Sequence, residues 1–255
     1  MKIEPSMQIL GGRAQPAPGT TGSAVKMALA IMTLVASTAT QADWSGGGEL
    51  GLVFARGNTD TETLNGSLGL EYTREKWTNA TSVSFLRSET EGNVDASRFV
   101  ATNDTQYALS PVSYIIGTAR YDQDKFSSFE FQTSASIGYG RKVVDNERQT
   151  LALEFGPGVR YSEIRSTGET ETDLIGRGSL DYRRAVSDTA ELTNVSLVET
   201  GSSNTFFENE TALSVSINDA LALKTAFSIR HNTDVEPGRE KTDYLTTLNL
   251  VYSFE

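Results

Sequence analysis

The sequence predicts an all-β fold, a transmembrane antiparallel up-and-down β-barrel of about twelve strands. Three observations favour this fold. A segment of the signal-peptide type opens the chain, apolar and polar residues alternate through nearly all that follows, and the alternating segments are longer than the strands of soluble domains.

The N-terminal segment has the order of a secretory signal. Early basic residues precede the apolar run Met27 to Ala39, and small residues follow up to Ala42. That run has 13 residues, too few for a membrane-spanning helix, which needs about 20. We expect a signal peptide over 1–42, with Met7 and Met27 as alternative starts, and an outer-membrane β-barrel over 43–255.

Composition excludes several classes of function. The chain has 33 acidic and 22 basic residues and a net charge of −11, so nucleic-acid binding is not expected, because phosphate contacts need a basic surface. The absence of cysteine excludes disulfides and thiolate chemistry, and the single histidine, His231, excludes a histidine-rich metal site. No run of 18 apolar residues follows Ala42, which excludes a helical membrane protein. We expect no cofactor and no metal.

Strands are predicted by alternation with a period of two. In the second candidate strand, Leu64, Leu68 and Tyr72 share one face, and Asn65 and Glu71 share the other. The pattern recurs, and we expect strands at 46–56, 61–73, 77–88, 97–109, 113–122, 128–142, 149–163, 172–183, 189–199, 206–217, 221–231 and 241–254. Most have 10 to 15 residues, whereas strands of soluble domains have about five or six and membrane-barrel strands about 9 to 11.

One predicted strand leaves its orientation open. In 113–122, neither Tyr114 with Ile116 nor Ile115 with Tyr121 is clearly the outer face. In another, 149–163, Pro157 removes a donor from the ladder, so we expect a bulge or a local gap there.

The connections alternate between short turns and longer polar segments, as in barrels with short periplasmic turns and long outer loops. Both chain ends then lie on the periplasmic side. Aromatic residues sort into two girdles, where amphipathic rings are favoured. On the short-turn side stand Trp44, Tyr72, Trp77, Tyr107, Tyr114, Tyr139, Tyr182 and Tyr252, and on the other side Phe54, Phe85, Phe99, Phe129, Phe131, Tyr161, Phe227 and Tyr244.

A bilayer leaves unpaired backbone groups unsatisfied, so spanning strands must close into a barrel with their polar faces inward. The candidate lumen-lining residues are Glu71, Arg98, Asp104, Glu154, Arg160, Arg177, Asp181, Arg183, Lys224 and Arg230. Two interpretations stay open, a charged constriction that selects solutes and structural ion pairs. Acidic residues assigned to the outer loops suit divalent cations that bridge lipopolysaccharide, with solvated surface charge as the simpler explanation; they are Glu89, Glu91, Asp95, Glu169, Glu171, Asp173, Glu208 and Glu210.

Several short motifs, in a fixed order, carry a resemblance to a known family. They are Gly57-Asn58-Thr59-Asp60, Asp124-Lys125-Phe126, Gly138-Tyr139-Gly140, Glu154 to Arg160, Pro237-Gly238 and Leu250 to Phe254. With these the chain from Trp44 to Phe254 resembles the YdiY-like family of putative salt-induced outer-membrane proteins, whose domain has no assigned function. The resemblance implies an outer-membrane barrel and a salt or osmotic response, and it supplies no catalytic residues. The aromatic Phe254 is penultimate here, whereas such barrels usually end on an aromatic residue that the barrel-assembly machinery reads.

From these features we expect a monomeric barrel in the cell outer membrane, with a structural role or narrow passive passage of ions and small solutes. Its partners would be outer-membrane lipid and lipopolysaccharide, and the barrel-assembly machinery during biogenesis. A barrel that binds lipid or another hydrophobic ligand is the alternative. An outer-membrane lipid hydrolase is a further alternative. In such an enzyme His231, the only candidate base, would have to activate a serine such as Ser84 or Ser214. We expect no enzyme.

Overall fold

The computed structural model describes residues 44–55 and 61–254. The predicted signal peptide and its cleavage after Ala42 lie outside these residues, as does the motif Gly57 to Asp60. Within them, no helix is long and apolar enough to cross a membrane.

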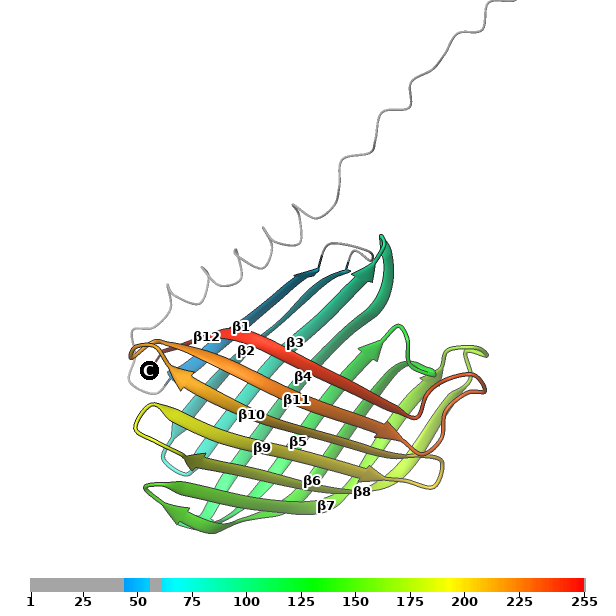
Figure 1. The fold of residues 1–255 in the computed structure, drawn as a ribbon. Coiled ribbons are helices and arrows are strands. Elements are labelled where there is room, and N and C mark those ends of the chain that lie inside the picture. The colour runs from blue at the N-terminus through cyan, green and yellow to red at the C-terminus, as the bar shows by residue number, and fades with distance from the viewer. Residues whose placement is uncertain (1–43, 56–60, 255) are drawn as a thin grey trace, which may run out of the picture. The chain divides into compact units, whose positions relative to one another are not determined.

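Twelve antiparallel strands close into a barrel, in which each strand pairs with its neighbours in sequence and β1 pairs with β12 (Figure 1). The predicted fold class is therefore confirmed. The strands are β1 Trp44–Ala55, β2 Thr61–Arg74, β3 Trp77–Thr90, β4 Asn93–Ser110, β5 Ser113–Asp124, β6 Phe129–Asn146, β7 Gln149–Ile164, β8 Thr170–Ala185, β9 Ala190–Thr200, β10 Thr205–Ser216, β11 Leu221–Asn232 and β12 Thr242–Phe254.

The seam between the first and last strands depends on a glycine. In β1, Gly51 pairs with Asn249 of β12 and Asn65 of β2. The two asparagine side chains hydrogen-bond to each other across β1 at 2.9 Å. A Cβ atom at Gly51 would lie 2.2 Å from the Asn249 amide oxygen, so the absence of a side chain permits the bond that ties the two ends of the sheet together.

The ladder between β6 and β7 is interrupted beside Pro157. Paired positions run to Ser136 with Gly158 and resume at Tyr139 with Phe155. This is the local gap expected from a residue without a backbone N–H.

The orientation of β5 is settled by burial. Tyr114 and Ile116 are 7% and 3% exposed and lie inside the barrel, whereas Ile115 is 41% exposed on the outer face. The assignment of Tyr114 to the short-turn girdle was therefore wrong, because its hydroxyl donates to Glu154 within the lumen. Phe129 is also not part of a girdle, since it is 9% exposed and lines a cavity at the end of the barrel that carries the long connections, which we call the outer mouth.

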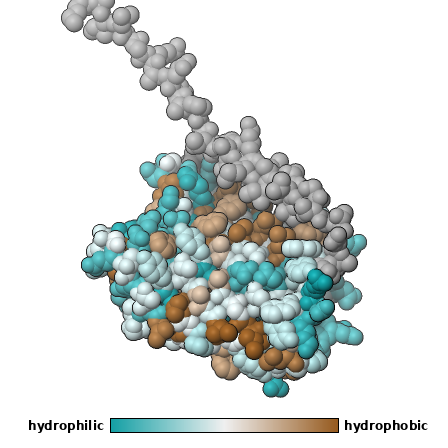
Figure 2. Space-filling view, turned by 180° about the vertical axis from the view of Figure 1, so that it is seen from behind, coloured by the Kyte–Doolittle hydropathy of each residue, from teal (hydrophilic) through white to brown (hydrophobic). Residues whose placement is uncertain are grey.

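The other aromatic rings that contact one another do so on the outer face, mostly between neighbouring strands. On the short-turn side Trp77 packs against Tyr107 at 4.8 Å, and on the other side Phe227 stacks on Tyr244 at 6.3 Å. The side chain of Phe54 is outside the described part. On the face shown in Figure 2, apolar side chains form several patches with polar side chains between them.

Candidate constriction in the barrel lumen

Four charged side chains meet across the lumen in the half of the barrel nearer the long connections. Nη2 of Arg120 on β5 lies 2.8 Å from Glu208 on β10 and 2.9 Å from Asp122. Arg230 on β11 donates to Asp122 and lies 3.4 Å from Glu208. Since β5 is five strands from β10 and six from β11, these contacts must cross the interior. We call these four side chains the cross-lumen cluster.

Two members of the cross-lumen cluster are largely shielded from water. The side chains of Arg230 and Asp122 are 10% and 9% exposed. Phe206 of β10 is 4% exposed, and its ring centroid lies 5.5 Å from the guanidinium of Arg120 and 5.1 Å from that of Arg230. Buried charges are tolerated when they are paired, and the face of an aromatic ring attracts cations. The cluster therefore forms a packed bar across the barrel.

A second contact narrows the same region. The hydroxyl of Ser134 on β6 donates to Glu199 on β9 at 2.8 Å, and both residues are buried. These strands are three places apart around the barrel, so the bond spans a chord of the lumen beside the cluster.

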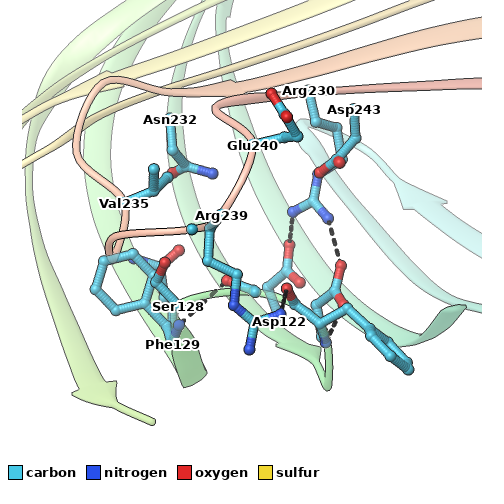
Figure 3. A pocket seen from close by; sticks show the side chains of 14 residues that line it. Asp122, Ser128, Phe129, Arg230, Asn232, Val235, Arg239, Glu240 and Asp243 are labelled. Carbon is cyan, nitrogen blue, oxygen red and sulfur yellow. Dashed lines mark hydrogen bonds and ion pairs between the residues drawn. The ribbon is translucent and has the colours of Figure 1, made fainter. Parts of the chain in front are cut away.

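The connection between β11 and β12 folds over the outer mouth. We call residues 233–241 the lid. Within it, the Glu236 amide donates to the Ser128 hydroxyl at 2.9 Å, and Arg239 donates to the Phe126 carbonyl at 2.6 Å. A cavity of about 250 Å³ lies between the lid and the cluster, with Arg230 in its wall (Figure 3).

Two arginines fix the connections that hold the lid. Arg165 donates to the carbonyl oxygens of Asp124, Ser127 and Phe129. Arg160, 2% exposed, donates to the Asn204 carbonyl at 2.6 Å. A backbone carbonyl that accepts from an arginine guanidinium forms a charge-assisted hydrogen bond, which is stronger than one between neutral groups. These bonds therefore stabilise the connections at the outer mouth.

Toward the short turns the lumen carries two further charged groups. Glu154 accepts hydrogen bonds from Tyr114 at 2.9 Å and Ser179 at 2.6 Å, and it lies 3.4 Å from Arg177. In the other group, Lys224 lies 2.9 Å from Glu49 and 2.9 Å from Glu210.

Closer to the short turns the interior opens to solvent. Val195 is 46% exposed on the inward face of β9, and the side chain of Arg183 is 59% exposed. The lumen thus narrows from an open inner end to the cross-lumen cluster near the outer mouth.

Comparison with known proteins decides the family. A family model described as "Protein of unknown function, DUF481" matches residues 48–254. The chain belongs to this family.

The "Uncharacterized protein YdiY" of Escherichia coli (strain K12) is 30% identical to this chain over 207 residues, which are 80% of each chain. The DUF481 chain also resembles solved outer-membrane barrels in fold. The NanC porin has a TM-score of 0.50 at 9% identity and covers 83% of this chain and 99% of its own. The translocator domain of the autotransporter NalP from Neisseria meningitidis has a TM-score of 0.48 at 14% identity, and the match covers 92% of this chain and 98% of that domain.

The structure places the ten predicted lumen residues on the inward side of their strands, with different neighbours. Arg230 belongs to the cross-lumen cluster, and Arg98 pairs in register with Asp124 just beside it. Glu154 and Arg177 meet each other, while Asp104 lies opposite Thr118 on the neighbouring strand. Arg160 pairs with Asp173, which the sequence led us to place in an outer loop, and Lys224 pairs with Glu49, which the sequence analysis did not single out. Asp181 and Arg183 pair with each other, and Glu71 is exposed near the short turns.

Six of the eight acidic residues assigned to the outer loops lie in strands instead, Glu89, Asp95 and Glu171 near strand ends and the other three with partners inside the barrel. Glu208 and Glu210 lie in β10 and reach Arg120 and Lys224 inside the barrel, and Asp173 in β8 is 8% exposed beside Arg160. The alternation of residues along a strand could have assigned Glu208 and Glu210 to the lumen. They lie within the predicted strand 206–217 and, at every second position, share a face with Ala212 and Ser214.

The remaining chemistry is sparse. His231 accepts or donates a hydrogen bond at 2.8 Å to the Thr242 hydroxyl, on the outward face of β11. Ser84 and Ser214 lie on inward positions of β3 and β10, on the opposite side of the sheet. Within residues 44–55 and 61–254, no group of three or more acidic, histidine or cysteine side chains is arranged to hold a metal ion.

Proposed function

We propose that the protein is a narrow outer-membrane pore for small ions, with the cross-lumen cluster as its constriction. The contact of Arg120 on β5 with Glu208 on β10 carries the proposal, because it divides the lumen where a solute would pass. The charged walls below it offer ion-pairing partners along the path. We expect a bar of packed charges to exclude larger solutes, so that only ions and water pass.

Location in the outer membrane is part of the same proposal. It is supported by the aromatic pairs at both ends of the outer face and by the porin-like fold. Outer-membrane lipid and lipopolysaccharide would then surround the barrel, and the barrel-assembly machinery would insert it. We include a role in salt or osmotic stress, which a deletion strain tests: its growth at high salt should fall and should recover with the wild-type gene.

Planar lipid bilayers test the pore. We expect a small single-channel conductance from the wild type and a several-fold larger one from the double variant Arg120→Ala/Glu208→Ala. This variant removes one charge of each sign and leaves Arg230 paired with Asp122. The matched control is Asp181→Ala/Arg183→Ala, a pair in the open inner end, which should leave the conductance unchanged.

Heat-modifiable migration on gels shows whether each protein is folded. If folded wild type and folded double variant both pass no current, the proposal is wrong and the barrel has a structural role. A hydrolase role gains no support from His231, whose neighbour is Thr242 and not a serine; we propose no enzymatic activity, which assays of lipid hydrolysis would check.

A further inference from the structure

The seam that joins the first and last strands is paired over only part of its length. The ladder between β1 and β12 ends at Gly51 with Asn249. Toward the outer mouth both strands continue, as 52–55 in β1 and 242–248 in β12, and there each is paired only with its other neighbour. The two ribbons diverge along this stretch (Figure 1). We call these two segments the open seam.

The open seam lies at the depth expected for the outer leaflet. On the outward face of β12, Tyr244 stacks on Phe227 in the girdle of this end, and Leu248 is 52% exposed nearer the middle of the wall. Unpaired backbone groups are not tolerated against lipid, but they are tolerated where they line a water-filled cavity. We therefore expect water from the lumen to reach these strand edges, so that the open seam connects the lumen with the membrane.

Apolar side chains line the open seam on its lumen side. Val53 and Leu245 stand four residues from Glu49 and Asn249, which hydrogen-bond to each other inside the barrel, so both apolar residues point inward. Val53 is 47% exposed there, and Leu245 is partly exposed. Small ions gain nothing from such a surface, whereas an apolar chain that covers it removes it from water.

At the mouth end of the open seam stand two carboxylates. Asp243 lies opposite Arg230 in the ladder, yet Arg230 forms its ion pairs with acidic residues of β5 and β10 instead. Glu240, at the end of the lid, lines the same cavity, where Figure 3 shows both carboxylates beside Arg230. Among the described residues neither carboxylate forms a hydrogen bond or an ion pair.

The other cations of the lid point elsewhere. Arg239 donates to the Phe126 carbonyl across the cavity, and Lys241 donates to the Thr233 carbonyl within the lid. The two free carboxylates therefore face the cavity beside an arginine whose charge is already matched. Such a site attracts a positively charged group.

We propose that the open seam admits a cationic amphiphile from the membrane, of the class of long-chain alkylamines. Its apolar chain lies against Val53 and Leu245, and its ammonium group pairs with Asp243 and Glu240. The order of the surfaces matches this occupant, because the apolar residues lie at the depth of lipid and the carboxylates at the depth of the girdle, where the head of an amphiphile stands. The inference rests on the proposed membrane location and not on conduction.

Photolabelling of the purified barrel in lipid nanodiscs tests the proposal. The probes are a long-chain alkylamine with a diazirine in its chain, and the matching alcohol and carboxylic acid. Mass spectrometry should find the amine on Val53 and Leu245 several-fold more often than either matching probe. At Leu174, an outward residue of β8 that is 83% exposed, all three probes should react alike from the surrounding lipid. Equal labelling of the open seam by the three probes overturns the proposal.

Removal of the carboxylates separates recognition of the ammonium group from simple access. Asp243→Asn/Glu240→Gln should lower labelling of Leu245 by the amine to the level of the alcohol. The control Glu169→Gln/Glu171→Gln removes the same charge from the same end of the barrel, at β8, four strands from β12, and should have no effect. An amine signal that survives the loss of both carboxylates overturns the proposal.

Closure of the open seam tests the route. Val53 and Thr247 would face each other if the ladder continued, and Val53→Cys/Thr247→Cys can be bridged with a short bis-maleimide, since the chain has no cysteine. The bridge should abolish labelling of Leu245 by the amine. The matched bridge Thr63→Cys/Ser88→Cys crosses the closed ladder between β2 and β3 at the register of Val53 and should leave the labelling intact.

Labelling of Leu245 that persists behind the bridged seam overturns the proposal. Heat-modifiable migration shows whether each variant is folded. None of these readouts depends on current, so a folded barrel that does not conduct would refute the pore and leave this inference standing on its own result.

Discussion

Arg230 shows why the lumen must be tested with pairs of substitutions. Its guanidinium forms ion pairs with Asp122, Asp124 and Glu208, and its side chain is 10% exposed. Removing one partner of a buried pair leaves an uncompensated charge and typically costs about 3–5 kcal/mol. A single substitution would therefore confuse lost folding with changed passage, whereas a substitution of both partners keeps the charges balanced.

A glycine offers a cleaner test at this scale. A Cβ atom at Gly140 on β6 would lie 2.1 Å from the ring of Tyr114, which Glu154 holds in place through a hydrogen bond of 2.9 Å. We expect Gly140→Ala to displace the ring and lower the free energy of unfolding by about 1–3 kcal/mol, the usual result of overpacking. The measurement is the midpoint of denaturant unfolding of the detergent-solubilised barrel.

Gly69 on β2 is the matched control for Gly140. A Cβ atom there meets nothing within 4 Å, so Gly69→Ala should leave stability unchanged or raise it by up to about 1 kcal/mol through the unfolded chain. Equal stabilities of the two variants would contradict the role given to Tyr114.

At the scale of the strands, the alternation of apolar and polar residues predicts which side chains face inward. It fails for a strand that carries apolar residues on both faces. The pattern in 172–183 separates Leu174 and Leu180 from Arg177 because one face meets lipid and the other water. In β5 the lumen side carries the apolar Ile116 at 3% exposure, so both faces look alike in the sequence.

The pairs of residues that meet across the lumen could not be predicted from the sequence, for a different reason. The contact of Arg120 with Glu208 joins strands five places apart, and such a contact depends on how far the closing sheet is staggered and tilted. No local pattern carries that information. The sequence could place Arg230 on an inward face but could not choose Asp122 as its partner.

The lid supplies a prediction of its own. It lies above the cross-lumen cluster, so the two obstruct the path in series, and the narrower one dominates the resistance. Replacing residues 234–240 by a short Gly-Ser turn should change the conductance of the wild type less than twofold. In the Arg120→Ala/Glu208→Ala background the same replacement should give a larger increase, which single-channel recording would measure.

Ser128→Ala serves as the mild version of this change, because it removes only the hydroxyl that accepts from the Glu236 amide. It should increase the flicker of the current without changing its mean. A lid replacement that alone opens the pore as widely as the cluster variant would move the constriction to the lid.

Across the whole molecule, acidic side chains outnumber basic ones in the lumen. Lys224 lies between Glu49 and Glu210, and the cross-lumen cluster adjoins Glu199 and Asp124. The full chain has a net charge of −11. Low-dielectric walls concentrate the potential of such groups along a narrow path, which raises the local concentration of cations.

We therefore expect the pore to prefer cations. In a potassium chloride gradient across a planar bilayer, the reversal potential should have the sign of potassium selectivity. It should shrink as the mean salt concentration rises from 0.1 to 1 M, because the Debye length falls from about 10 Å to about 3 Å. The variant Glu210→Gln leaves Lys224 paired with Glu49 and should reduce the preference, whereas Asp181→Asn/Arg183→Gln in the open inner end should not. A reversal potential of the opposite sign in the wild type would show that the arginines of the cluster, rather than the acidic walls, set the selectivity.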